Sequence, residues 1–278
     1  MTTTTVEATR ALPAARGSRA KAFLRRRRPL LLGTLGILVM LAAWQVCAST
    51  GVVDETISST PLRIAAAEGH LFGSGEIWAP LRLTGLEFGL GLGITIVAGI
   101  PIGVLLGRVR FLDEMAQPVI NVLNAVPYVM FLPIIIFWFG IGNTSRVLLV
   151  VWAGILPLII NTIAGVKHLD RDFVRVAEVF CAGRLFFMRA VALPAALPFI
   201  LTGVRLALAR ALVGAIVAEL FLASGGLGYF VQTATANFDM TGAMAGIVIM
   251  AVVALILTRA IGYLERRLTH WSGSQPNR

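Results

Sequence analysis

Long apolar runs, separated by short charged segments, constrain this chain more than any other feature of its sequence. Of its 278 residues, 57% are hydrophobic and only 14% are charged, whereas soluble domains carry about 25% charged residues. The hydrocarbon core of a bilayer is about 30 Å thick, so a helix needs about 20 mostly apolar residues to cross it. The runs are continuous, whereas a transmembrane β-barrel would need short alternating segments. The sequence therefore predicts an all-α, polytopic membrane protein.

The apolar runs divide the chain into about six transmembrane helices and two tails. The predicted spans are residues 29–48, 83–107, 119–140, 147–165, 199–222 and 242–264. Together they form one transmembrane domain over residues 29–268, with a core at about 80–265, followed by a C-terminal tail at 269–278. Residues 60–78 are amphipathic and are expected to lie along the membrane surface.

The first 28 residues are rich in Thr, Ala and Arg, and we expect them to form a disordered basic cytoplasmic tail. A cleaved signal peptide is the alternative. The basic region is long for a signal peptide, however, and no A-x-A-like site closes the apolar run.

The distribution of Lys and Arg predicts the orientation of the spans. The chain has a net charge of +10, and its basic residues concentrate before residue 29, around 108–110, within 166–198 and after 264. Because cytoplasmic loops carry the excess of Lys and Arg, both termini are expected in the cytoplasm. These residues flank spans instead of lining one face, which argues against nucleic-acid binding. Cys47 and Cys181 are expected on opposite sides of the membrane, and the three histidines are scattered, so neither a disulfide nor a metal site is predicted.

Small and polar residues mark the spans that face protein or water. Glycines spaced four apart, at 85, 89 and 93 and at 99, 103 and 107, predict two strips of close helix packing. Prolines at 127 and 133 interrupt the third span and free backbone carbonyls, which at membrane depth must lie beside protein or water. The polar groups in the spans have two possible roles, hydrogen bonding between helices or lining a translocation path. The candidates for the path are Asn121, Asn124, Tyr128, Asn161 and Glu219.

Ionisable groups within spans are costly and should be paired inside the bundle. Glu87, Arg210 and Glu219 are such groups. A structural ion pair and a contact with substrate both remain open for them.

A long charged segment at residues 166–198 separates the fourth and fifth spans. Within it, Phe173, Val176, Ala177 and Phe180 recur at helical spacing, and Leu193-Pro194 then breaks the helix. An amphipathic helix at the cytoplasmic surface is suited to dock in a groove of a soluble protein.

This segment resembles the EAA loop of importer-type ABC transporter permeases of the binding-protein-dependent group. The Leu-Pro of that motif is Leu193-Pro194, and the similarity extends over about residues 60–268. Ala218-Glu219 and Gly225–Tyr229 resemble the nitrate/sulfonate/taurine-type permeases in particular. Further stretches that carry the resemblance are Phe137–Gly142, Asn161–Val166 and Leu193–Pro198.

The resemblance implies that the loop forms the coupling helix that contacts an ATPase. The residues expected to make this contact are Arg175, Val176, Ala177, Glu178, Cys181, Ala182, Leu193 and Pro194. The chain departs from the motif at two of them, because Arg175 stands at the glutamate position and Cys181 at the glycine position. Glu178 lies nearly one turn after Arg175 and places an acid close to the same face.

The resemblance further implies a type I ABC importer permease fold and a permease subunit of an ATP-driven importer for a small anionic solute. The chain has no G-x-x-x-x-G-K-[ST] motif, so ATP must be bound by a partner subunit, and neither a cofactor nor a catalytic residue is expected here. The expected partners are cytoplasmic ABC ATPase subunits, an extracytoplasmic substrate-binding protein, a second permease chain in a homodimer and the lipid bilayer. The expected location is the bacterial plasma (inner) membrane.

Two other functions are consistent with a polytopic chain. A secondary transporter acting without an ATPase predicts internal repeats and paired carboxylates within the membrane, and no clear repeat is present. A membrane-embedded enzyme needs clustered catalytic side chains, and the scattered histidines argue against one.

Overall fold

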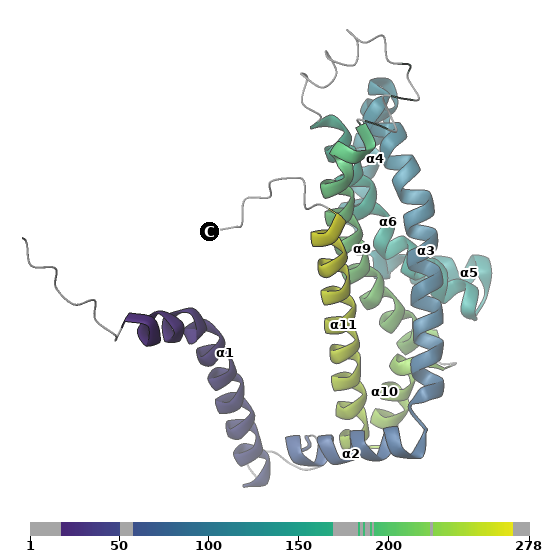
Figure 1. Ribbon diagram of the computed structural model, residues 1–278. Helices are drawn as coiled ribbons and strands as arrows, with labels where there is room; N and C mark the ends of the chain where they lie inside the picture. Colours follow the sequence, from purple (N-terminus) through teal and green to yellow (C-terminus); the bar gives the residue numbers. More distant parts are fainter. Residues whose placement is uncertain are drawn as a thin grey trace, which may run out of the picture. The chain divides into compact units, whose positions relative to one another are not determined.

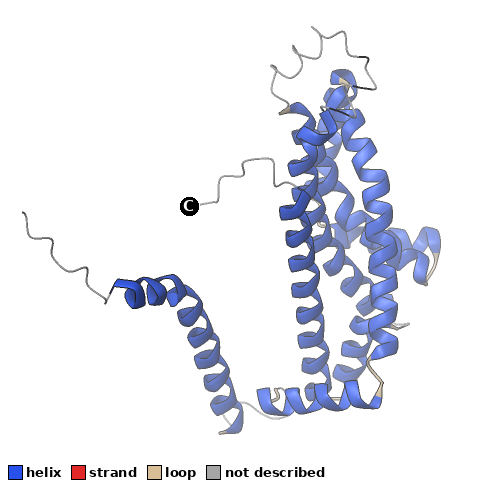
Figure 2. Cartoon of the chain, viewed as in Figure 1, coloured by secondary structure: helices blue, strands red, loops and turns tan. Residues whose placement is uncertain are grey.

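The computed structural model describes residues 18–50, 58–168, 192–222 and 225–268, together with the single positions 183, 186 and 190. Figure 2 shows helices throughout, and the described residues contain no strand. Five described helices are long and apolar enough to cross a membrane, or six if one bent pair counts as a span. The all-α, polytopic prediction is therefore confirmed. The chain divides into two units, residues 1–55 and 56–278.

The first unit contains the helix α1 (Ser18–Ser49), whose apolar part is Leu32–Ser49. The helix begins ten residues before the predicted tail ends at residue 28, so this part of the expected disordered tail is helical. Its sequence from 18 to 28 contains five Arg, two Ala, one Lys and one Leu, all of them good helix formers. Residues 1–17 lie outside the described part of the chain.

In the second unit, a short helix lies across one end of the long ones. This helix, α2 (Pro61–Ser74), runs crosswise to α3 (Trp78–Arg108) and α11 (Met240–Leu268) in Figure 1. The Thr60 hydroxyl caps its first turn by accepting a hydrogen bond from the Arg63 N–H at 3.3 Å, and Gly75 ends it in the left-handed region. The hydroxyls of Ser59 and Thr241 are 2.9 Å apart and join the start of α2 to α11. This is the geometry expected for a helix that lies along a membrane surface.

The core of the second unit is built on α6 (Asn143–Lys167), which packs along α3 and along α9 (Leu193–Leu222). Side chains at 0% exposure, such as Leu149, Leu158 and Ala207, fill this contact. Glycines allow the helices to approach closely: a Cβ at Gly203 of α9 would lie 2.9 Å from the Cβ of Asn161. Close contact through small residues is how helices associate where lipid removes the hydrophobic driving force.

Only one of the two predicted glycine strips on α3 makes such a contact. A Cβ at Gly99, Gly103 or Gly107 would collide with side chains of α6, whereas a Cβ at 85, 89 or 93 would meet no described atom within 4 Å. Gly91 faces Val150 of α6 instead. The first strip therefore makes no helix contact within the described chain, and α3 presents positions 91, 95, 99, 103 and 107 to α6.

The third predicted span is not one helix. The chain forms α4 (Arg110–Ala125), the 3-10 turn η1 (Tyr128–Phe131) and α5 (Leu132–Phe139), with a bend of 95° between α4 and the η1–α5 segment. Pro127 lies at the bend, where it cannot donate the backbone hydrogen bond that would continue α4. The segment 223–241, between the predicted spans 199–222 and 242–264, contains a further helix, α10 (Gly226–Ala236).

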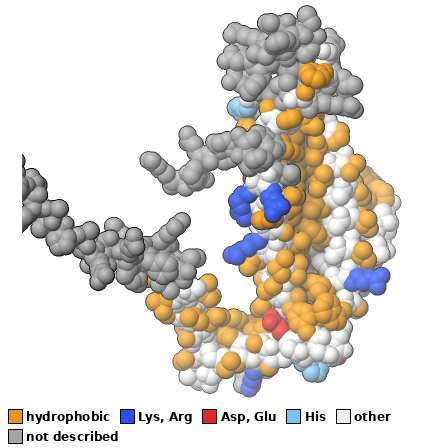
Figure 3. Space-filling view, in the orientation of Figure 1, with side chains coloured by type: hydrophobic (Ala, Val, Ile, Leu, Met, Phe, Trp, Pro, Cys, Tyr) orange, Lys and Arg blue, Asp and Glu red, His pale blue; other side chains and the backbone are white. Residues whose placement is uncertain are grey.

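Large apolar side chains remain exposed on the outer faces of the bundle. Figure 3 shows hydrophobic side chains extending over the long helices, with Lys and Arg at few places on that face. Val97 of α3 is 75% exposed and Phe137 of α5 is 87% exposed. In water such faces would be unfavourable, so they are surfaces for lipid or for another protein.

Candidate functional site

The ends of the charged loop are held against the bundle. Lys167, the last residue of α6, donates to Asp113 Oδ2 of α4 at 2.5 Å, and the ring of His168 stacks on Phe199 of α9 with centroids 5.7 Å apart. The chain therefore leaves α6 and enters α9 close to one point, and the same point is tied to α4. A displacement of the loop would act on α4, α6 and α9 together.

The loop itself is mostly outside the described part of the chain. Leu193 and Pro194 form the first turn of α9, where proline is tolerated because its missing N–H would have no partner there. The six other predicted coupling residues lie outside the described residues: Arg175, Val176, Ala177, Glu178, Cys181 and Ala182. Their assignment remains a prediction.

Two of the five predicted path residues line a common cavity at the bend between α4 and η1. Asn124 and Tyr128 share a cavity of about 320 Å³ with Arg210 of α9, and Trp152 and Leu156 of α6 form its apolar wall. The Arg210 guanidinium donates from Nη1 to Asn124 Oδ1 at 3.4 Å. This cavity combines a cation, an amide and a phenol with an apolar wall, a composition suited to a small solute.

The other three path candidates lie elsewhere. Asn121 is exposed one turn earlier on α4. Asn161 donates from Nδ2 to the Pro157 carbonyl of its own helix at 2.8 Å, so its amide is used locally. Glu219 is completely buried in a separate ionic cluster. Of the polar residues proposed for one path, the structure thus brings only Asn124 and Tyr128 together.

That ionic cluster joins α3 and α6 to α9 and to the start of α10. Glu87 of α3 pairs with Arg146 of α6, with Oε1 2.8 Å from Nη1, and both side chains are at most 3% exposed. Arg146 Nη2 also donates to Asn143 Oδ1 at 2.7 Å, and its Nη1 to the Gly225 carbonyl at 3.3 Å. The partner of Glu87 is therefore Arg146. Arg210, which was expected to be paired inside the bundle, is exposed and belongs to none of the described ion pairs. Arg146 falls in the short turn between the predicted spans 119–140 and 147–165, on the side of the membrane expected to hold few basic residues, and this departure from the positive-inside pattern is the sequence signal for a buried role.

Glu219 completes the cluster by fixing the start of α10. Its Oε2 accepts the backbone N–H of Gly228 at 2.7 Å, while the Leu227 N–H donates to the Thr84 hydroxyl at 2.9 Å. Gly226 has φ +91°, and a Cβ there would collide with the Glu219 carboxylate. The Gly-Gly-Leu-Gly stretch is thus required for the chain to lie directly on the buried acid.

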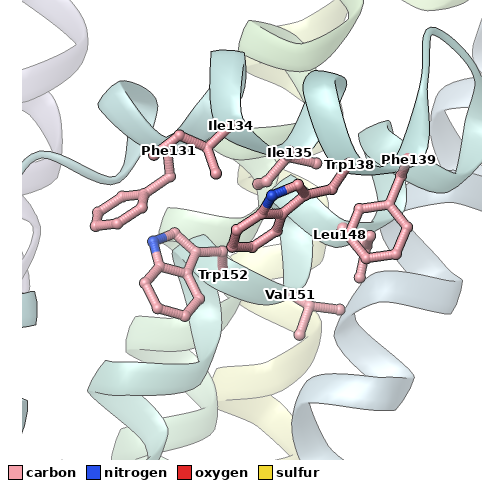
Figure 4. A pocket seen from close by; sticks show the side chains of 8 residues that line it. All are labelled: Phe131, Ile134, Ile135, Trp138, Phe139, Leu148, Val151 and Trp152. Carbon is pink, nitrogen blue, oxygen red and sulfur yellow. The ribbon is translucent and has the colours of Figure 1, made fainter.

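A second cavity, of about 350 Å³, lies between α5 and α6. Figure 4 shows Trp138 and Phe139 of α5 pointing toward Leu148, Val151 and Trp152 of α6. Phe131 packs on Trp152 with ring centroids 4.9 Å apart. The walls of this second cavity are almost entirely aliphatic and aromatic. The second cavity therefore offers little to bind an ionic solute, and it is distinct from the polar cavity at Arg210.

The profile described as "Binding-protein-dependent transport system inner membrane component" matches residues 99–270. The chain belongs to this family. It is therefore a multi-pass inner-membrane permease component and not an enzyme, and its partners are an ATPase and a substrate-binding protein.

Relatives within the family are similar over nearly the whole chain. The putative aliphatic sulfonates transport permease SsuC of Bacillus subtilis is 34% identical, covering 90% of this chain and 91% of that protein. The taurine transport permease TauC of Escherichia coli is 33% identical, covering 90% and 92%. The riboflavin transport permease RibX of Chloroflexus aurantiacus is 31% identical, covering 95% and 98%.

The permease fold is confirmed by a solved structure. The MetNI methionine ABC transporter in an inward-facing conformation matches with a TM-score of 0.58 at 18% identity, covering 69% of this chain and 94% of that one. Because the sequence identity is only 18%, this match supports the fold and not the substrate.

Proposed function

We propose that this permease forms the membrane path of an ATP-driven importer for a small organic anion of the sulfonate or taurine class. The observation that carries the substrate class is the similarity, at 33–34% identity over nine-tenths of the chain, to permeases named for aliphatic sulfonates and taurine. The cavity at Asn124, Tyr128 and Arg210 supports it, because a guanidinium within a span suits an anion.

The proposed transporter contains two copies of this chain with both termini in the cytoplasm. The transmembrane domain is residues 29–268, with its core at 80–265, between an N-terminal tail and a C-terminal tail at 269–278. The ATPase subunits bind the loop at 166–198 from the cytoplasm, and the binding protein delivers solute on the opposite side. When ATP draws the ATPases together, the loop moves and the permease switches between inward- and outward-facing states.

The described contacts support a route by which motion of the loop would reach the proposed path. Lys167 ties the start of the loop to Asp113 of α4, and α4 carries Asn124 at its far end. The end of the loop enters α9, which carries Arg210. The two helices that supply Asn124 and Arg210 to the polar cavity are thus both connected to the loop that the ATPase is proposed to bind.

Co-purification tests the assignment of the loop. From detergent-solubilised membranes of cells that also produce the cognate ATPase, the tagged chain is expected to retain an ATPase with a P-loop. In the variants Arg175→Glu and Glu178→Arg, substrate-stimulated ATP hydrolysis is expected to fall by about tenfold, because a reversed charge at an interface is strongly unfavourable. The amount of permease in the membrane should not change.

The matched control is Arg108→Glu, which reverses a charge at the cytoplasmic end of α3, outside the loop. It should leave ATP hydrolysis near the wild-type rate. Unchanged hydrolysis in both loop variants would refute the assignment of Arg175 and Glu178. Absence of any ATPase from the wild-type eluate would refute the proposed function itself.

A further inference from the structure

The depth of Arg210 in its helix is the starting observation. Arg210 lies twelve residues before Leu222, the end of α9, which at 1.5 Å per residue places it about 18 Å from that end. The apolar stretch of α9 is a candidate membrane span. A guanidinium at such depth faces a polar cavity or another protein, because exposure to lipid is costly.

Arg210 is also separate from the ionic contacts among the described residues of the bundle. The described ion pairs join Arg110 to Glu114, Arg146 to Glu87, Lys167 to Asp113 and Arg205 to Glu265, and none of them includes Arg210. Its hydrogen bond to the amide oxygen of Asn124 is long, at 3.4 Å. A guanidinium has five N–H donors, so most of this group's capacity is available to a ligand.

The walls of the cavity complement this charge. Tyr128 adds a hydroxyl and Asn124 an amide, both supplied by the bend at Pro127. On the other side, Trp152, Ala153 and Leu156 of α6 present apolar surface. The volume of about 320 Å³ is at the lower end of the range for small-molecule sites.

We propose that Arg210 is the anion-binding residue of the translocation path and that the cavity takes a small organic anion. The sulfonate or carboxylate group accepts from the guanidinium fork and from the Asn124 amide or Tyr128 hydroxyl, while the organic part lies against Trp152 and Leu156. Anionic lipid headgroups lie at the bilayer surface, so a free solute is the proposed occupant. The inference rests on the proposed function for the direction of transport, but its test needs no ATPase.

The test measures the charge selectivity of the cavity by thiol labelling. Leu123 lines the cavity, and Leu123→Cys is introduced into the full-length chain in which Cys47→Ser and Cys181→Ala remove the native thiols. Labelling rates are compared for the anionic reagent sulfonatoethyl methanethiosulfonate and the cationic reagent trimethylammonioethyl methanethiosulfonate. We expect the anionic reagent to react faster by about tenfold, since a nearby unit charge attracts one reagent and repels the other. Ethanesulfonate in excess should slow this labelling, and tetramethylammonium should not.

Three substitutions at two positions of α9 complete the design. Arg210→Gln should abolish both the preference and the protection, and Arg210→Lys should keep the preference but weaken protection because the fork is lost. Arg205→Gln removes a charge from the same helix, outside the cavity, and should change neither. Equal labelling by the two reagents, a preference that survives Arg210→Gln, or no protection by ethanesulfonate would overturn the inference. None of these outcomes bears on whether an ATPase co-purifies with the chain, so the proposed function is tested independently of this inference.

Discussion

Replacing Arg146 by Met is expected to remove most of the folded permease from the membrane. Arg146 is 2% exposed and lies between the buried carboxylate of Glu87 and the Gly225 carbonyl. Methionine fills part of the volume but leaves Glu87 buried without its cation. Removing one partner of a buried pair costs about 3–5 kcal/mol, a large part of the total stability of a typical protein. The measurement is the yield of monodisperse protein in detergent and its thermal unfolding midpoint.

A surface arginine and a double variant serve as controls. Arg110→Met removes an equally charged residue that is 92% exposed and paired with Glu114, and it should cost less than about 1 kcal/mol. Combining Arg146→Met with Glu87→Leu removes the stranded carboxylate and should restore much of the yield. If Arg146→Met proved as stable as Arg110→Met, the ionic cluster would not hold α3, α6 and α10 together as described.

The second large effect is expected from Gly103→Leu. A Cβ at this position would lie 2.6 Å from the Thr162 Cβ and 3.1 Å from the Ile159 carbonyl oxygen, so α3 and α6 would have to separate. Overpacking of this kind costs about 1–3 kcal/mol or more, here along the second largest contact in the bundle. The thermal midpoint in detergent should fall clearly, and Gly103→Ala should produce a smaller decrease of the same sign.

Gly93 offers a matched control on the same helix. A Cβ there would meet no described atom within 4 Å, so Gly93→Leu should leave the midpoint of the solubilised chain nearly unchanged. Equal destabilisation by the two leucines would mean that α3 packs on α6 in another register than the one described.

Much of the fold could be predicted because the bilayer dictates helix length. The apolar runs at 83–107, 147–165, 199–222 and 242–264 lie within α3, α6, α9 and α11. The break at Pro127 was also foreseeable, since proline cannot continue the hydrogen bonding of α4. Its 95° angle was not, because the angle depends on tertiary packing such as Phe131 against Trp152.

Side-chain pairing was harder to predict than the spans. Glu87 and Glu219 were recognised as costly in a membrane, but periodicity within a single span cannot identify a partner from another helix. The partner of Glu87 is Arg146, which lies at the start of α6. The N–H of Gly228 reaches the Glu219 carboxylate only because Gly225 and Gly226 take positive φ values. Asn161 has the polarity expected of a path residue, yet its own helix satisfies its amide. The coupling residues from 175 to 182 lie outside the described chain and remain predictions based on resemblance.

The central claim is that this chain imports solute only when an ATPase drives it. The most direct measurement is uptake of radiolabelled taurine or ethanesulfonate into proteoliposomes that contain the permease, its ATPase enclosed with ATP, and its binding protein outside. We predict uptake that requires ATP hydrolysis and the binding protein and that stops when the ATPase is omitted. Uptake by the permease alone, driven by a proton or sodium gradient, would contradict this account and identify a secondary transporter.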